Sequence, residues 1–394
     1  MLLLTASIVF WISVLALVHS YVIYPILLSY LARNKSQNQI IYEPNDDLPF
    51  ISIIMAVRNA EYVIDEKIRS IYSNGYPLVK IEFLIGSDAS DDKTNKLIKS
   101  LIKQFPTIKL REYSERSGKV KIINDLSLKA KGDILVFTDA NAIPKKNTIF
   151  QLVKHFSNQE IAVLCSNLVN STSSNKDISV QEDVYLKTEI KLKYNEGGLW
   201  GNLMGAYGAF FAIRKSEFKQ VPKNFLVDDF FISFNAILNG KKAILEPEAV
   251  VYEQISGNIQ DEFRRKVRIS SGNFQNLKEF AAILFSNKLS LIFSFISHKV
   301  LRWLGPIFIL LAITSVAFLF NYSIFYKFVA AILFFSLFSP IIDYLFRKFG
   351  IHIILLRFIT HYYYMNLGLF IGLLKYIKGV KTNVWEPTKR ESKP

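Results

Sequence analysis

Acidic side chains recur along this sequence where an apolar run meets a polar segment with helical periodicity. The clearest examples are Asp88, Asp139 with Asn141 in the segment TDANAIP, and the pair Asp228 and Asp229. Carboxylate and amide oxygens are ligands that suit Mg²⁺ and Mn²⁺. A carboxylate can also accept hydrogen bonds from a nucleobase or ribose, or take the proton of an attacking hydroxyl. If the fold brings these side chains together, they would suit a metal-bound nucleotide diphosphate beside a hydroxyl acceptor.

Basic residues accompany these acids. Lys119 follows Gly118 at the start of a helical pattern, and Arg58 follows the apolar run ISIIMAV. Ammonium and guanidinium groups would compensate the charge of a bound diphosphate. Neither a lone Gly-Lys pair nor a lone Asp-x-Asn motif is specific, so the prediction depends on the ordered set of motifs.

The acids also have a structural interpretation, which stays open. Carboxylates near the first turn of a helix commonly accept hydrogen bonds from its free N–H groups and interact favourably with its dipole. This alternative applies most directly to Asp91, Asp92 and Asp228.

The elements that would position these side chains alternate along the chain. Short runs rich in β-branched residues occupy 51–57, 81–87, 107–113, 133–139 and 161–166. Segments with helical periodicity lie between them, near 61–74, 91–104, 119–130 and 147–157. This alternation predicts an α/β domain with a mostly parallel sheet and helices on each face. Ligands bind at the carboxyl ends of the strands in such sheets, which is where the acids fall.

Long apolar runs flank this region. Residues 2–31 contain no Asp, Glu, Lys or Arg and exceed the roughly 20 residues that a helix needs to cross a bilayer. The runs 303–320, 325–346 and 359–377 are also long enough. The basic residues that follow the first run place the next segment in the cytoplasm. Counting spans from there puts the basic C-terminal segment outside, which conflicts with the same rule, so the number of spans stays open.

These observations predict six regions. They are an N-terminal anchor (1–32), a linker (33–49), a catalytic domain (50–260), basic and amphipathic interface helices (261–300), about three transmembrane helices (301–378) and a basic tail (379–394). Trp385 in the tail is either a headgroup anchor or a contact of the catalytic domain.

Composition is consistent with this division. Hydrophobic residues make up 51% of the 394 residues, yet charged residues still make up 21%. The net charge of +15 fits membrane flanks, anionic lipid or an anionic substrate. The single cysteine, Cys165, excludes an intramolecular disulfide and a cysteine-rich zinc site.

Residues 50–270 resemble the inverting family 2 glycosyltransferases, above all the membrane-bound branch with cellulose synthase, hyaluronan synthase and poly-N-acetylglucosamine synthase. The resemblance implies a GT-A fold and assigns roles to matching positions. The donor-binding residues would be Ala56, Arg58, Asn59, Glu61, Asp88, Lys119, Asp139 and Arg268. Asp139 and Asn141 would hold the metal, and Asp229 would be the general base. Acceptor contacts would come from Trp200, Gly208, Asp228 and Arg265.

Two departures from the family pattern matter. The family's Asp-x-Asp motif is Asp139-Ala140-Asn141 here, so a neutral amide replaces one carboxylate and metal affinity should be weaker. The Gln-x-x-Arg-Trp motif of processive members matches only at Arg268, because Arg265 and Ile269 occupy the Gln and Trp positions. This argues against processive polymer synthesis.

We therefore expect an integral membrane enzyme, in a bacterial inner or cell membrane, with a cytoplasmic catalytic domain. It would transfer a sugar with inversion from a nucleotide-diphosphate donor, for which the resemblance favours UDP, to a lipid-linked or saccharide acceptor in cell-envelope or exopolysaccharide synthesis. Mg²⁺ or Mn²⁺ is the expected cofactor, membrane lipid is an expected partner, and nucleic acid is not. A processive polysaccharide synthase and a non-catalytic nucleotide-sugar-binding subunit are the alternatives.

Overall fold

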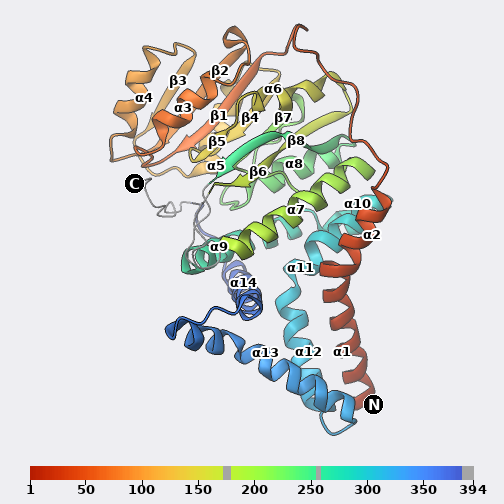
Figure 1. Ribbon diagram of the computed structural model, residues 1–394. Helices are drawn as coiled ribbons and strands as arrows, with labels where there is room; N and C mark the ends of the chain where they lie inside the picture. The colour runs from red at the N-terminus through yellow and green to blue at the C-terminus, as the bar shows by residue number, and fades with distance from the viewer. Residues whose placement is uncertain (172–178, 254–258, 384–394) are drawn as a thin grey trace. The chain divides into compact units, whose positions relative to one another are not determined.

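The computed structural model describes residues 1–171, 179–253 and 259–383 (Figure 1). The chain divides into two compact units. A sheet unit comprises Leu31–Ser173, Leu186–Ser256 and Val380–Pro394, and a helical unit comprises Met1–Tyr30, Ser174–Tyr185 and Gly257–Gly379. Most of the predicted basic tail, including Trp385, lies outside the described residues.

An eight-stranded sheet forms the centre of the sheet unit, in the order β3-β2-β1-β4-β7-β6-β8-β5. Its strands are β1 (Ile51–Val57), β2 (Ile81–Asp88), β3 (Ile108–Tyr113), β4 (Ile134–Thr138), β5 (Ala142–Pro144), β6 (Ile161–Asn170), β7 (Phe210–Arg214) and β8 (Lys242–Glu253). β1 pairs in parallel with β2 and β4, whereas β7 runs antiparallel to both β4 and β6. The predicted α/β fold is confirmed, and the sheet is mixed because β7 runs antiparallel to its two neighbours and β5 runs antiparallel to β8.

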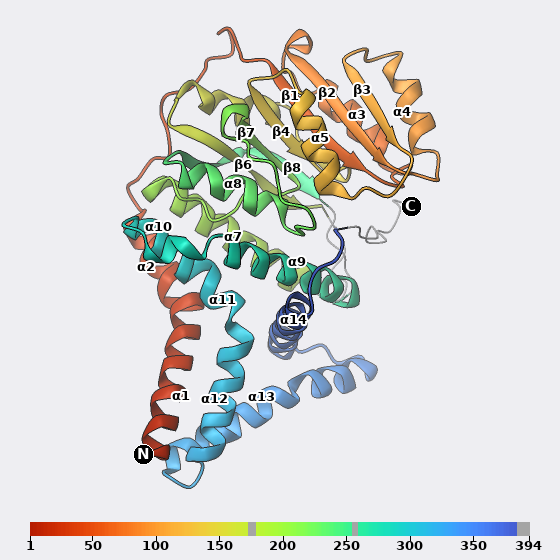
Figure 2. The same cartoon turned by 180° about the vertical axis from the view of Figure 1, so that it is seen from behind.

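Helices cover both faces of this sheet, as predicted. They are α3 (Ile64–Tyr72), α4 (Thr94–Ile102), α5 (Lys119–Lys129), α6 (Thr148–Val153) and α8 (Asp228–Leu238), with single 3₁₀ turns at Leu78–Lys80, Lys154–Ser157 and Lys215–Glu217. The view in Figure 1 has α3 and α6 in front of the sheet, and the reverse view in Figure 2 has α5 and α8 in front. Strands covered on both faces have no solvent-facing side, which is why β1 is almost continuously apolar and every residue of β2 is buried.

The register of the strands brings several chain segments to one edge of the sheet. β1, β2 and β4 are parallel, so their carboxyl ends at Val57, Asp88 and Thr138 lie at the same edge. Phe210, the first residue of antiparallel β7, pairs with Thr138 and brings the preceding loop to that edge. Ala142 in β5 pairs with Glu253 at the end of β8. The edge therefore collects the residues from which a site could be built.

The helical unit contains α1 (Leu2–Val18), a π-helical turn (His19–Ile23), α2 (Tyr24–Leu31), α9 (Ile259–Glu279), a 3₁₀ segment (Ala281–Phe285) and α10 (Leu289–Ser294). It continues with a π-helical segment (Phe295–Val300), α11 (Leu301–Trp303), α12 (Gly305–Leu319), α13 (Ile324–Lys348) and α14 (Ile354–Ile377). The helix α7 (Ser179–Trp200) contributes its residues up to Tyr185 to this unit and the rest to the sheet unit.

Among the described residues, two helical segments are long and apolar enough to cross a membrane, Leu2–Leu31 and Ile324–Lys348. The pair Leu289–Trp303 and Gly305–Leu319 also qualifies when taken together, although it bends by 63°. The predicted span at 359–377 forms part of α14, which is not among the helices that qualify.

Candidate active site

Lys119 forms ion pairs with two of the predicted acidic residues, Asp139 and Asp228. It is the first residue of α5, and its Nζ lies 3.1 Å from Asp139 Oδ1 and 3.4 Å from Asp228 Oδ2. Burial lowers the pKa of Lys119, but the carboxylates of Asp139, Asp228 and Asp229 together raise it above its usual value. Lys119 therefore stays charged and ties the residue after β4 to the first residue of α8.

The backbone holds the Asp229 carboxylate in place. Its Oδ2 accepts a hydrogen bond of 2.8 Å from the Gly208 N–H, and its Oδ1 accepts one of 2.8 Å from the Phe230 N–H. A Cβ at position 208 would lie 2.7 Å from Oδ2, so only glycine permits this approach. Burial, and then the neighbouring Asp228, raise the pKa of Asp229, while Lys119 lowers it. A fixed carboxylate with a raised pKa suits a general base working near neutral pH.

Asp139 and Asn141 stand at the same edge of the sheet. The Asn141 Nδ2 donates a hydrogen bond of 3.0 Å to Glu253 Oε1, and its amide oxygen carries no hydrogen bond among the described residues. Among all the residues that the structure describes, no group of three or more His, Cys, Asp or Glu side chains could hold a metal ion. Mg²⁺ is often bound by one or two carboxylates and completed by substrate phosphates. The donor set of Asp139 and Asn141 therefore fits an open site that needs the diphosphate.

Glu253 was not predicted, although it too ends a strand. Its pairing with Ala142 and its hydrogen bond with Asn141 place it beside the metal motif. The signal that could have identified it is its position at the end of the apolar run AVVY.

Lys67 on α3 is a second residue that sequence reasoning missed. Its side chain is fully buried, and its Nζ donates to Thr138 Oγ1 at 2.7 Å and to the carbonyl oxygen of Ala142. The Phe210 ring lies 5.1 Å away, at a distance typical of a cation–π contact. Burial lowers the pKa of Lys67 to about 7, against the opposing effect of Asp139. Lys67 thus binds Thr138 and Ala142, the residues on either side of the turn that carries Asp139 and Asn141.

A pH-dependent stability follows from Lys67. An unfolded lysine has a pKa of roughly 10.4, so between about pH 7 and that value the unfolded chain binds more protons than the folded chain. Stability should therefore rise with pH in this window, by at most about 1.4 kcal/mol per unit. Lys67→Met should flatten the rise in melting temperature of the detergent-solubilised chain between pH 7 and 9, whereas Lys96→Met, at an exposed position on α4, should not. Equal pH responses in wild type and Lys67→Met would contradict this assignment.

Asp88 shapes the loop that leads into α5. Its Oδ1 accepts hydrogen bonds from the Ser117 N–H at 2.5 Å and the Gly118 N–H at 3.3 Å, and Arg116 Nε lies 3.4 Å from its Oδ2. The Arg58 guanidinium donates to the Asp88 carbonyl oxygen at 2.9 Å. Both predicted donor residues are therefore at the expected edge, where they fix neighbouring loops.

The remaining polar residues after β1 and β2 bind one another. Asn59 Nδ2 donates to Asp91 Oδ1 at 2.6 Å, and the Asp91 N–H donates back to Asn59 Oδ1 at 3.1 Å. Asp92 accepts from the Glu61 N–H at 3.1 Å and from the Thr94 N–H at 2.9 Å. Asp92 thus binds the N–H of Thr94, the first residue of α4, which supports its structural interpretation, whereas the Asp91 carboxylate binds the Asn59 side chain instead.

The other predicted residues belong to β1, α7 and α9. Ala56 is the penultimate residue of β1, and Trp200 ends α7 with its side chain partly exposed. Arg265 and Arg268 belong to α9 in the helical unit, where Arg265 Nη1 donates to Glu262 Oε1 at 2.9 Å.

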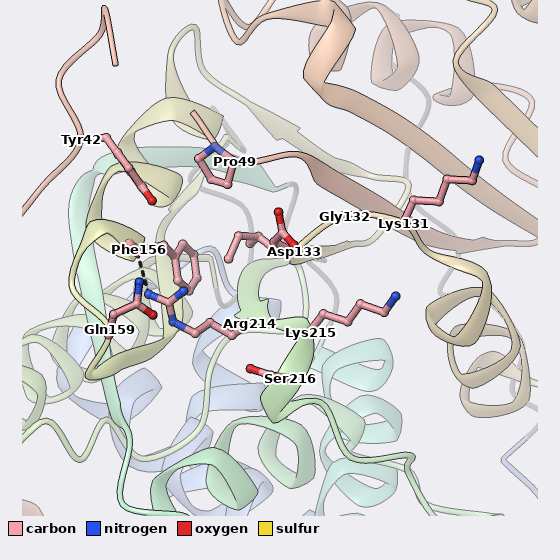
Figure 3. Close-up of a pocket in the computed structure, with 11 residues that line it drawn as sticks. Tyr42, Pro49, Lys131, Gly132, Asp133, Phe156, Gln159, Arg214, Lys215 and Ser216 are labelled. Carbon is pink, nitrogen blue, oxygen red and sulfur yellow. Dashed lines mark hydrogen bonds between the residues drawn. The ribbon is translucent and has the colours of Figure 1, made fainter. Parts of the chain in front are cut away.

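A pocket of about 640 Å³ lies at the other end of β4 (Figure 3). Its lining includes Ile134, the first residue of β4, whereas Asp139 follows the last. Arg214 in its wall donates to the carbonyl oxygens of Phe156 at 2.6 Å and Ile161 at 2.8 Å. This cation thus ties backbone segments together, and the pocket is separate from the acid cluster.

Two family models match this chain. Residues 52–221 match glycosyl transferase family 2, and residues 199–343 match glycosyl transferase family group 2. The probable glycosyltransferase YdaM of Bacillus subtilis is 22% identical over 250 residues, which are 61% of this chain and 59% of that protein. A β-monoglucosyldiacylglycerol synthase of Trichormus variabilis is 28% identical over 124 residues, 31% of this chain and 26% of that one. The chain thus matches less than two thirds of the length of these relatives.

A similar solved structure covers nearly the whole chain. It is mannosyltransferase PcManGT from Pyrobaculum calidifontis in complex with GDP-Man and Mn²⁺, with a TM-score of 0.69 and 20% identity, covering 96% of this chain and 99% of that one. At this identity the likeness establishes a shared fold, that of the GT-A glycosyltransferases.

Proposed function

We propose, from the premise that residues 52–221 form a glycosyltransferase family 2 domain with the GT-A fold, that this chain transfers a sugar with inversion from a nucleotide-diphosphate donor to a hydroxyl acceptor at a membrane. The observation that carries the proposal is the position of Lys119. It lies between Asp139 and Asp228 and so links the candidate metal motif with the helix start that bears Asp229. A donor and an acceptor bound there would meet at one edge of the sheet.

Each of these side chains has a role in a single displacement. Asp229, held by the Gly208 N–H, takes the proton of the attacking hydroxyl. Lys119 offers a fixed positive charge close to Asp139, where negative charge develops on the departing diphosphate. Asp139 and Asn141 would hold Mg²⁺ or Mn²⁺, which when bound neutralises that diphosphate. Lys67 keeps the turn between them in shape.

The acceptor is proposed to be lipid-linked or a saccharide at the membrane surface. Two candidate spans and the likeness to diacylglycerol-glycosylating enzymes support an integral membrane protein. The positive charges that follow the first span support a cytoplasmic catalytic domain. For the donor, the similar solved structure contains GDP-Man, whereas the resemblance at the level of motifs favours UDP, so both nucleotides belong in the test.

The test is a donor panel on the detergent-solubilised full chain, with release of nucleoside diphosphate as the readout. We expect release from one class of UDP- or GDP-sugar, and a loss of at least about tenfold on chelation with EDTA that added Mn²⁺ restores, because a bound metal contributes several kcal/mol to such leaving groups. Release that is unaffected by EDTA would remove the metal from the proposal.

The same panel separates the alternatives. Long polymer made from one donor would favour the processive synthase despite Ile269 at the tryptophan position. Donor binding without any release, in the presence of lipid and saccharide acceptors, would favour the non-catalytic subunit.

A further inference from the structure

Lys193 on α7 is a buried cation that forms no ion pair with any residue the structure describes. Its side chain is 4% exposed, and its Nζ lies 3.4 Å from the centroid of the Tyr207 ring. In the part of the chain that the structure describes, Lys193 makes no hydrogen bond and no ion pair. The described polar atoms that are fully enclosed and also lack a hydrogen-bond partner do not include the Lys193 Nζ. Because this nitrogen has no such partner, it must keep some contact with solvent. Three N–H donors on a nearly buried charge therefore have no protein acceptor.

This cation belongs to the surroundings of the proposed base. Tyr207 directly precedes Gly208, whose N–H binds the Asp229 carboxylate. Burial and Asp228 raise the pKa of Asp229, and both Lys119 and Lys193 lower it, so both ammonium groups act on the same carboxylate. Lys119 forms ion pairs with Asp139 and Asp228. Lys193 instead contacts Tyr207, in the loop that positions the proposed base.

The acids closest along α7 do not neutralise Lys193 by direct contact. Glu189 and Glu196 lie within about one helical turn of it and are both buried. Glu196 Oε2 instead accepts the Met204 N–H at 3.1 Å, and neither carboxylate lies within ion-pair distance of Lys193. Buried charges are normally paired with an opposite charge or with hydrogen-bond acceptors.

We propose that Lys193 and the Tyr207 ring form a subsite for an anionic group of the acceptor, namely a phosphate close to the attacking hydroxyl. The proposal rests on the transfer proposed at Asp229 and specifies its acceptor as a hydroxyl compound that carries a phosphate, as in a glycerophosphate headgroup. An ammonium group only donates hydrogen bonds, and such bonds are stronger to a charged oxygen than to a neutral hydroxyl. Lys193 should therefore prefer a phosphate oxygen to a hydroxyl group. The hydroxyl remains the nucleophile because Asp229 is placed to take its proton.

The first test measures binding rather than turnover, so that it does not depend on the proposed function. The detergent-solubilised full chain is saturated with UDP, GDP and Mn²⁺ to occupy the donor side, and is titrated calorimetrically with glycerol 1-phosphate and, as the matched uncharged probe, with glycerol. We expect the phosphate to bind at least tenfold more tightly than glycerol, and Lys193→Gln to remove at least tenfold of that affinity. Lys193→Arg, which keeps the charge, should retain most of it, as should Lys191→Met at an exposed position of the same helix.

The outcomes are distinct. Equal binding of the two probes to wild type, or equal phosphate affinity in wild type and Lys193→Gln, would overturn the proposal even if the enzyme is active. If the melting temperature shows that Lys193→Gln does not fold, Lys193→Arg is tested in its place. An Arg variant that folds but does not bind the phosphate would overturn the proposed subsite.

A second comparison identifies the source of the phosphate. With a donor that turns over, phosphatidylglycerol and diacylglycerol are offered as acceptors in vesicles of phosphatidylcholine. A KM for phosphatidylglycerol that rises at least tenfold in Lys193→Gln, with an unchanged KM for diacylglycerol, assigns the subsite to a lipid headgroup. Equal changes for both lipids would instead make Lys193 a support for Asp229 and contradict an anion-binding role.

Discussion

Asp229→Asn is expected to lower kcat for sugar transfer by about 10²- to 10⁴-fold, the usual contribution of a positioned general base. The substitution preserves the shape of the side chain and an oxygen that can accept the Gly208 N–H, but it removes the group that takes the proton. Donor affinity should stay within a few-fold of wild type, because the donor-side contacts of Lys119 are made with Asp139 and Asp228. Nucleoside diphosphate release, measured beside calorimetric donor binding, gives both quantities.

A glycine substitution tests the position of this carboxylate separately from its chemistry. The Cβ of Gly208→Ala would lie 2.7 Å from Asp229 Oδ2 and must displace it, and a displacement of about 1 Å can cost on the order of 10²-fold in rate. Gly198→Ala is the matched control, because the atom nearest to its Cβ would be 3.5 Å away, an ordinary contact. Full activity in both Asp229→Asn and Gly208→Ala would exclude Asp229 as the base.

The metal motif gives the second large effect. Asp139→Ala should lower kcat/KM by at least about 10²-fold, because the metal contributes several kcal/mol and Asp139 is the only carboxylate within the Asp139–Asn141 motif. Asn141→Asp should act in the opposite direction on affinity, lowering the Mn²⁺ concentration for half-maximal rate several-fold, because it restores a charged ligand.

The two variants are informative as a pair when Mn²⁺ is titrated against initial rate. Glu253→Gln is a third variant, because the Glu253 carboxylate accepts a hydrogen bond from the Asn141 amide. If Glu253 only orients that amide, this variant should change the Mn²⁺ titration little. An Asp139→Ala enzyme with an unchanged Mn²⁺ titration would show that the metal binds elsewhere.

The sheet and its helices could be predicted because their signals are local. β1 is almost continuously apolar and β2 has an apolar centre, because helices cover both faces of the sheet, and the polar residues at the strand ends mark the edge where ligands bind. The direction of β7 was not predictable in this way. An antiparallel strand in the middle of a sheet has the same apolar composition as its parallel neighbours.

Two of the residues that were missed, Lys67 and Lys193, have no local signal in the sequence. Lys67 lies in an ordinary helical pattern, and only the fold brings it under Thr138 and Ala142. Lys193 resembles any other lysine of a charged helix until its contact with the Tyr207 ring is seen. Buried lysines of this kind depend on contacts between segments distant in the sequence, so a single sequence cannot distinguish them from surface lysines.

The stereochemistry of the product tests the central claim most directly. A single displacement, in which a hydroxyl deprotonated by Asp229 attacks the anomeric carbon as the diphosphate leaves, must invert that carbon. We predict that proton NMR of the product formed from an α-linked donor will show only the β-anomer from the first detectable turnover. A product that keeps the α-configuration would contradict the account, because it requires a different mechanism from the one that these residues support.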